Sequence, residues 1–81
     1  MVLIKEIDTK TNFGTVYVTV TTEKREIMVS FCKTNVFQVS VYTTQRLSVG
    51  RTFETWAEAL NGYKNKNIVA MIRAAKAEIE R

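Results

Sequence analysis

The chain of 81 residues contains no histidine, no proline, a single cysteine and only three glycines. Histidine is the most common general acid or base near neutral pH, so its absence excludes histidine-dependent serine and cysteine triads. It also excludes zinc sites that are built on clusters of histidine and cysteine. The glycine-rich motifs of P-loops and dinucleotide-binding turns are missing from the sequence as well. We therefore expect a protein that is not an enzyme and that holds no cofactor or metal.

The single cysteine, Cys32, cannot form an intramolecular disulfide, which indicates a reducing compartment. Residues 1–6 contain too short an apolar stretch for a signal peptide and no small-residue cleavage site. No run approaches the ~20 apolar residues that a transmembrane helix needs. We therefore expect a cytoplasmic protein without membrane contact, and we interpret Cys32 as a packing residue.

What the chain does contain is typical of a globular protein, with 46% hydrophobic and 25% charged residues. Its length allows one hydrophobic core, and no linker or internal repeat divides it. We therefore expect a single domain over residues 1–81.

The amino-terminal half alternates between apolar and polar residues over residues 16–21, 27–32 and 37–42. This period of two is typical of half-buried antiparallel strands. A weaker pattern over residues 2–7 predicts a first strand, so that the sheet extends over about residues 2–43. Two segments stay ambiguous. Residues 8–12 fit a hairpin loop or a longer excursion, and residues 43–52 fit a loop, a short extra strand or an arm.

The carboxy-terminal third changes to a helical period and predicts helices over about residues 54–62 and 66–80. The apolar stripe of the first is Phe53, Trp56, Ala57 and Leu60, and that of the second is Ile68, Ile72, Ala75 and Ile79, with Val69 and Met71 beside it.

The ends of these helices carry their own signals. Thr55 and Glu58 fit a capping box at the start of the first helix, and Thr52 is a competing N-cap. Gly62 is placed to end that helix in a left-handed conformation, and Asn65 or Asn67 is available as the next N-cap.

Strands followed by helices define an α+β arrangement. We expect an antiparallel meander of three to four strands, followed by two helices that pack on one face of the sheet. The bulky part of the core should consist of aromatic residues, because these bury the most area. They are Phe31, Phe37, Phe53 and Trp56.

The sheet face away from the helices is the most informative surface. It should carry hydroxyl groups, two tyrosines and few charges, on residues Tyr17, Thr19, Thr21, Met28, Ser30, Cys32, Val36, Gln38, Ser40 and Tyr42. Such a face fits an ordinary half-solvated sheet. It also fits a protein-binding surface, because interface cores favour Tyr and Met and are depleted in charge. In that hypothesis Tyr17 and Tyr42 are the anchors, and Arg46 and Arg51 lie at the rim.

An alternative follows from the net charge of +4. A small basic protein can bind nucleic acid by stacking bases on tyrosines while cations contact phosphates. The candidate phosphate contacts are Lys33, Lys64, Lys66, Arg73 and Lys76. Most of these belong to the helical layer rather than to the tyrosine face, so solubility is the simpler interpretation of the charge.

The edges of the predicted meander suggest a further alternative. Because the chain has no proline to block strand addition, either edge can accept a strand from a partner or from a second copy. A homodimeric structural protein that forms by pairing of strand edges is therefore a second alternative.

The layout of a histidine-free, proline-free chain resembles that of small phage-encoded accessory proteins. It is similar to small anti-CRISPR proteins, among them an inhibitor of the type I-F surveillance complex with a four-stranded antiparallel sheet and two helices. The residues that carry the resemblance are Ile4–Lys5, residues 48–50, Ile79 and Arg81. The resemblance implies a stoichiometric inhibitor, located in the host cytoplasm, that blocks a larger complex by binding its surface.

Overall fold

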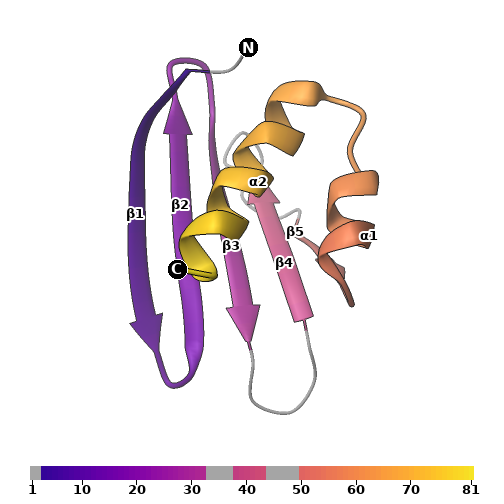
Figure 1. The fold of residues 1–81 in the computed structure, drawn as a ribbon. Helices are drawn as coiled ribbons and strands as arrows, with labels where there is room; N and C mark the ends of the chain where they lie inside the picture. The colour runs from indigo at the N-terminus through magenta and orange to yellow at the C-terminus, as the bar shows by residue number, and fades with distance from the viewer. Residues whose placement is uncertain (1–2, 33–37, 44–49) are drawn as a thin grey trace.

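A computed structural model describes residues 3–32, 38–43 and 50–81, and it shows an antiparallel sheet followed by two helices (Figure 1). The strands follow one another across the sheet in sequence order. Their bounds are β1 (Ile4–Asn12), β2 (Thr15–Thr22), β3 (Glu26–Cys32), β4 (Gln38–Thr43) and β5 (Gly50–Phe53), and the helices are α1 (Trp56–Asn61) and α2 (Lys66–Ile79). The predicted α+β class and meander are confirmed, with five strands in place of three to four.

Strands β2, β3 and β4 form the centre of the sheet and alternate strictly between its two faces. Val18 pairs with Val29, and Val29 pairs with Val41, so one row of valines crosses all three strands. The three valines are fully buried. Their face, together with α1 and α2, encloses the core, which consists of Val18, Val20, Ile27, Val29, Phe31, Val39, Val41, Phe53, Ala59, Met71, Ile72 and Ala75.

Strand β1 is longer than predicted, because residues 8–12 continue the strand instead of forming a loop. Asn12 pairs with Thr15, which leaves a two-residue turn of Phe13 and Gly14. Both have positive φ angles, 49° and 80°, as a type I′ hairpin turn requires. The ring of Phe13 is 97% exposed at this turn.

Strand β5 includes the last residues of the segment 43–52, which the sequence left ambiguous. Residues 50–53 pair with β4, and the pair Val39–Phe53 places Phe53 on the core side of the sheet. Phe31 and Phe53 are buried as predicted, and Trp56 is partly buried against the core. Phe37 lies outside the described residues.

Helix α1 begins at the predicted cap. The Thr55 hydroxyl accepts a hydrogen bond from the amide of Glu58 at 3.1 Å. The Glu58 carboxylate accepts from the amide of Glu54 at 3.2 Å, one residue before the position that a standard capping box uses. The predicted apolar stripe is wrong at one position, since Ala57 is exposed and Ala59 is the buried alanine. A helix of six residues has few positions that face the core, and the direction in which it lies on the sheet decides which alanine is buried.

Gly62 ends α1 in a right-handed conformation, with φ −77° and ψ −6°. The prediction of a left-handed glycine is therefore wrong. The residue is small for a different reason: a Cβ atom there would lie 2.8 Å from Cε1 of Phe53. Glycine allows the chain to pass directly over that buried ring.

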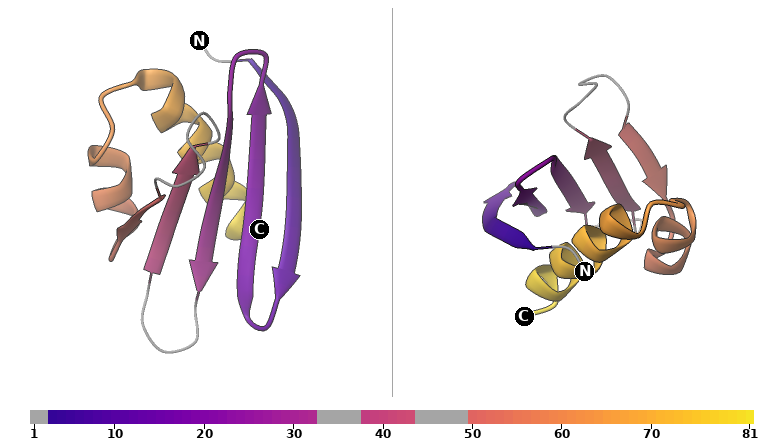
Figure 2. Two further views of the ribbon diagram at one scale, coloured as in Figure 1. Left: turned by 180° about the vertical axis from the view of Figure 1, so that it is seen from behind. Right: turned by 90° about the horizontal axis from the view of Figure 1, so that it is seen from above.

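Helix α2 begins at Asn65, whose side chain accepts hydrogen bonds from the amides of Asn67 and Ile68. It buries Met71, Ile72 and Ala75, and it crosses the sheet diagonally in front of β2 and β3 (Figure 1). Viewed from above, both helices lie on the same side of the sheet (Figure 2), which confirms the predicted arrangement of layers.

Candidate functional site

The sheet face opposite the helices is the surface that the sequence singled out, and no described helix or strand covers it (Figure 2). We call it the open face. Its central residues are Tyr17, Thr19, Thr21, Met28, Ser30, Cys32, Gln38, Ser40 and Tyr42, which alternate with the buried residues of β2, β3 and β4. Most of them are half-buried because neighbouring side chains shade one another. Val36, which was expected here, lies outside the described residues.

Strand register determines where the two tyrosines lie. Tyr17 pairs with Ser30, which pairs with Ser40, while Tyr42 pairs with Met28 in the adjacent row. With ~4.8 Å between strands and ~3.4 Å per residue, the two Cα atoms are roughly 12 Å apart. The tyrosines are therefore separate anchors on one surface, with the half-buried Met28 side chain between their strands.

A glycine positions one of these anchors. Gly50 is the partner of Tyr42 across β4 and β5. A Cβ atom on Gly50 would overlap the ring atoms Cδ1 and Cε1 of Tyr42, so the ring lies flat over the glycine. The phenol remains 37% exposed in this position. This role of Gly50 could not be predicted, because it depends on which residue of β5 pairs with Tyr42.

Charge is confined to the borders of the open face. The nine central residues carry no ionisable group except the phenols and the thiol. Strand β1 places Asp8 beside Thr19 and Lys10 beside Tyr17, and Glu26 accepts a hydrogen bond from the Thr21 hydroxyl at 3.3 Å. An uncharged centre with tyrosine and methionine, bordered by charged groups, is the composition typical of a protein-binding surface.

Arg51 does not belong to this surface. It pairs with Val41 and therefore lies on the helix-bearing side of the sheet. Its Nη1 atom donates a hydrogen bond to the carbonyl of Gly62 at 2.5 Å, and its guanidinium lies about 5 Å from the centres of the Phe53 and Tyr63 rings. The predicted rim residue thus ties β5 to the end of α1, and the structure does not bring it together with the tyrosines. Arg46 lies outside the described residues.

The phenol of Tyr63, beside Arg51, has a shifted pKa. Burial raises the pKa of Tyr63 above its ordinary value of 10.0, and the nearby positive charge of Arg51 offsets part of this effect. The Tyr63 ring packs edge-on against Phe53, with 6.0 Å between ring centres. Ionisation of this phenol is therefore less favourable in the folded protein than in the unfolded chain.

This shift predicts a loss of stability at high pH. The unfolded chain releases the Tyr63 proton at a lower pH than the folded protein does, so the free energy of unfolding falls as the pH rises above about 10. Tyr63→Phe should reduce this fall. Urea unfolding of both proteins at about pH 8 and about pH 11 measures it, and an equal fall in both would contradict the prediction.

The described cations among those proposed for phosphate contact lie away from the open face. Lys64 and Lys66 are exposed around the start of α2, and Arg73 is exposed further along this helix. Lys76 forms a 2.7 Å ion pair with Glu80 one turn later. Lys33 lies outside the described residues. The described candidates are thus on the helical layer, and the structure does not join them to the two tyrosines.

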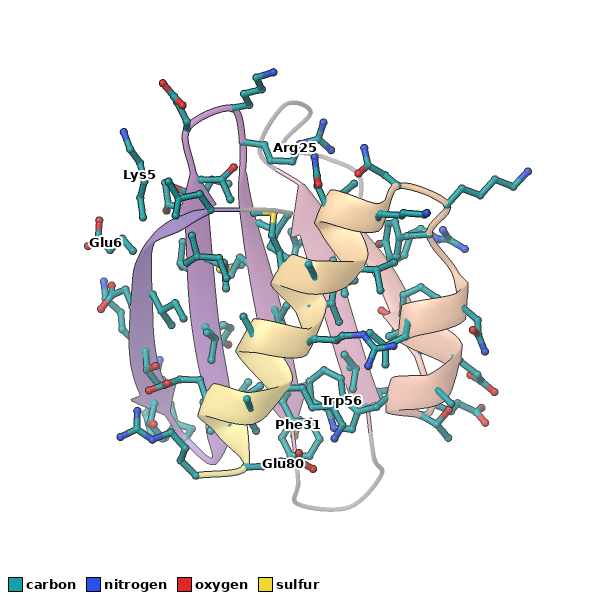
Figure 3. All side chains as sticks on the ribbon, turned by 45° about the horizontal axis from the view of Figure 1, so that its top comes forward. Lys5, Glu6, Arg25, Phe31, Trp56 and Glu80 are labelled. Carbon is teal, nitrogen blue, oxygen red and sulfur yellow. The ribbon has the colours of Figure 1, made fainter. Side chains whose placement is uncertain are left out.

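A groove of about 600 Å³ opens at the other end of the helical layer. Phe31 and Trp56 stack there with ring centres 5.7 Å apart and planes 13° from parallel, and Glu80 lies beside them (Figure 3). The sequence placed both rings in the core, whereas they also line this concavity. Its lining is completed by Gly14, Val16, Ile79 and Arg81.

Other classes of site receive no support from the part of the chain that the structure describes. Within it, no group of three or more acidic, cysteine or histidine side chains is placed to hold a metal ion. No helix there is long and apolar enough to cross a membrane. No family model, curated protein or solved structure matches the chain.

Proposed function

We propose that the protein is a non-catalytic binding protein, which uses the open face to occlude the surface of a larger protein partner. The observation that carries the proposal is the uncharged centre of the open face, with Tyr17, Met28 and Tyr42 on one side of a hydrogen-bonded sheet. A rigid aromatic surface loses little conformational entropy on binding, since its backbone is already fixed by the ladder of hydrogen bonds.

The proposal includes a phage-type inhibitor or accessory protein, similar in layout to small anti-CRISPR proteins. It is supported by an antiparallel sheet followed by two helices and by the lack of histidine for catalysis. An inhibitor that acts by occlusion needs only a stable surface of the right shape, which a domain of this size can provide.

Binding of nucleic acid is less well supported by the geometry. Base stacking on the tyrosines requires cations on the same face to contact the phosphates. The exposed cations Lys64, Lys66 and Arg73 belong to the helical layer instead. On the open face Lys10 lies beside Tyr17, but Asp8 follows in the neighbouring row.

Alanine substitution of the anchors tests the proposal. We expect Tyr17→Ala and Tyr42→Ala each to weaken capture of the partner from host extract by more than about thirtyfold, as loss of an aromatic hot spot does. Circular dichroism checks that both variants fold. The control is Arg73→Ala on the helical layer, which should capture the same protein as the wild type.

The outcomes separate the hypotheses. If both tyrosine variants capture the partner as well as the wild type does, the open face is not the binding surface. If instead the protein shifts single-stranded oligonucleotides at low salt, and the shift weakens steeply as salt rises, the nucleic-acid alternative replaces the proposal.

A further inference from the structure

Strand β1 forms an exposed edge of the sheet. Among the strands that the structure describes, β1 pairs with β2 alone, so its other side presents backbone N–H and C=O groups over a strand of nine residues. Every side chain from Lys5 to Asn12 is exposed. Among the described residues the exposed large hydrophobic side chains are Leu3, Ile7, Phe13 and Tyr42, and the first three lie on or beside β1.

Two of the features that usually prevent edge pairing, a proline and a β-bulge, are missing from the central and last parts of β1, although charged side chains are present. β1 contains no proline. Its one irregularity lies between Ile4 and Glu6, at the beginning of the strand. From Glu6 to Asn12 each residue pairs one-to-one with β2, so this segment is a regular strand with an unpaired outer side.

We propose that β1 pairs with β1 of a second copy of the chain, antiparallel and centred on Thr9. In this register Asp8 of each copy lies opposite Lys10 of the other, so two pairs of opposite charge form. Thr9 lies opposite Thr9, Ile7 opposite Thr11 and Glu6 opposite Asn12. The pairing uses the regular segment alone and ends before the irregularity at Ile4.

The charges of β1 favour this register over the neighbouring ones. Both copies turn the same sheet face to the same side only if the pairing is centred on a residue of β1. A pairing centred between two residues would turn the two sheets in opposite directions. Centring on Asp8 forms two Glu6–Lys10 pairs, but it opposes Asp8 to itself at the centre and draws Ile4 and the irregularity beside it into the pairing. Centring on Lys10 opposes two lysines, and centring on Ile7 opposes Glu6 to Asp8 twice. Like charges directly opposite one another are destabilising, so Thr9 is the centre that the sequence favours.

The resulting dimer has one continuous sheet across two copies, with all helices on the same side. Its two open faces form a single surface that is twice as long. The interface consists of one strand pair and its neighbours, which places it among small, reversible interfaces.

Charge reversal tests both the partner and the register. We expect the wild type to sediment as a mixture of monomer and dimer between roughly 10 µM and 1 mM. Asp8→Lys and Lys10→Asp should each weaken association at least about tenfold, because both cross-strand pairs become repulsive. An equimolar mixture of the two variants should dimerise again, since each copy then supplies the charge that the other needs. The swap D8K/K10D should likewise restore the homodimer.

A covalent trap provides the second readout. Directly opposed residues of antiparallel strands have Cα atoms ~4.5–5.5 Å apart, within the range of a disulfide. In a Cys32→Ser background, Thr9→Cys should form a disulfide-linked dimer under mild oxidation, and Asp8→Cys should do so much less. A wild type that remains monomeric at about 1 mM would overturn the proposal. Association unaffected by Asp8→Lys and Lys10→Asp, or better trapping by Asp8→Cys, would overturn the register.

Discussion

Phe53→Ala is expected to lower the free energy of unfolding by about 3–5 kcal/mol, as truncation of a buried phenylalanine does. Phe53 is 9% exposed at the end of β5. Its ring contacts Tyr63 edge-on and lies beneath the Arg51 guanidinium and against Gly62. The substitution therefore removes the centre of the cluster that holds α1 and β5 together, and it opens a cavity beneath both.

The expected loss is large compared with the roughly 4–12 kcal/mol of total stability for a domain of this size. It should lower the melting temperature by about 12–40 °C, since 1 kcal/mol corresponds to about 4–8 °C. The matched control is Phe13→Ala at the exposed β1–β2 turn, where we expect a change within about 0.5 kcal/mol. Equal losses in both variants would show that Phe53 is not a core residue.

Ile72→Ala is expected to cost about 2–5 kcal/mol in the free energy of unfolding. Ile72 is fully buried on α2, the helix that packs on β2 and β3. The truncation leaves a cavity between helix and sheet, while the better helix propensity of alanine returns only a few tenths of a kcal/mol. Urea unfolding followed by circular dichroism measures the loss.

Two variants of the same helix make this result specific. Ile72→Val removes a single methylene group and should cost about 0.5–1.5 kcal/mol. Ile68→Ala makes the same chemical change at a partly buried position one turn earlier, so it should cost less than Ile72→Ala. If Ile68→Ala proves the more damaging, the register of α2 on the sheet differs from the one described.

The elements that were predicted well are those in which local and tertiary signals agree. In β2, β3 and β4 one face is buried, so apolar residues recur at every second position and determine both strand and face. The starts of the two helices were predictable because each depends on one local residue, Thr55 or Asn65, whose side chain accepts hydrogen bonds from the first turn.

The elements that were missed or left ambiguous lack such a signal. Residues 8–12 are exposed on both faces of β1, so there is no buried face to impose an apolar repeat. This part of the strand is held by its backbone pairing with β2. Strand β5 is only four residues long and buries only its last side chain, Phe53, which is too short for an alternating pattern to stand out.

The candidate site was predictable in part. Tyr17 and Tyr42 fall on one face by alternation alone, as the register confirms. Arg51 could not be placed from the sequence, because its side of the sheet depends on a β4–β5 pairing that the pattern left ambiguous. The same pairing brings Gly50 under the ring of Tyr42, a contact between residues that no local rule connects.

The order of strands across the sheet also has a consequence for the way in which the chain reaches this fold. Each strand is hydrogen-bonded only to its neighbours in sequence, so the sheet can assemble by successive closure of short hairpins. The contacts of α2 with β2 join segments far apart in the chain, so we expect them to form late. Loop-closure entropy is therefore lost in small increments before the core is sealed, a topology that favours rapid folding for a protein rich in β-structure.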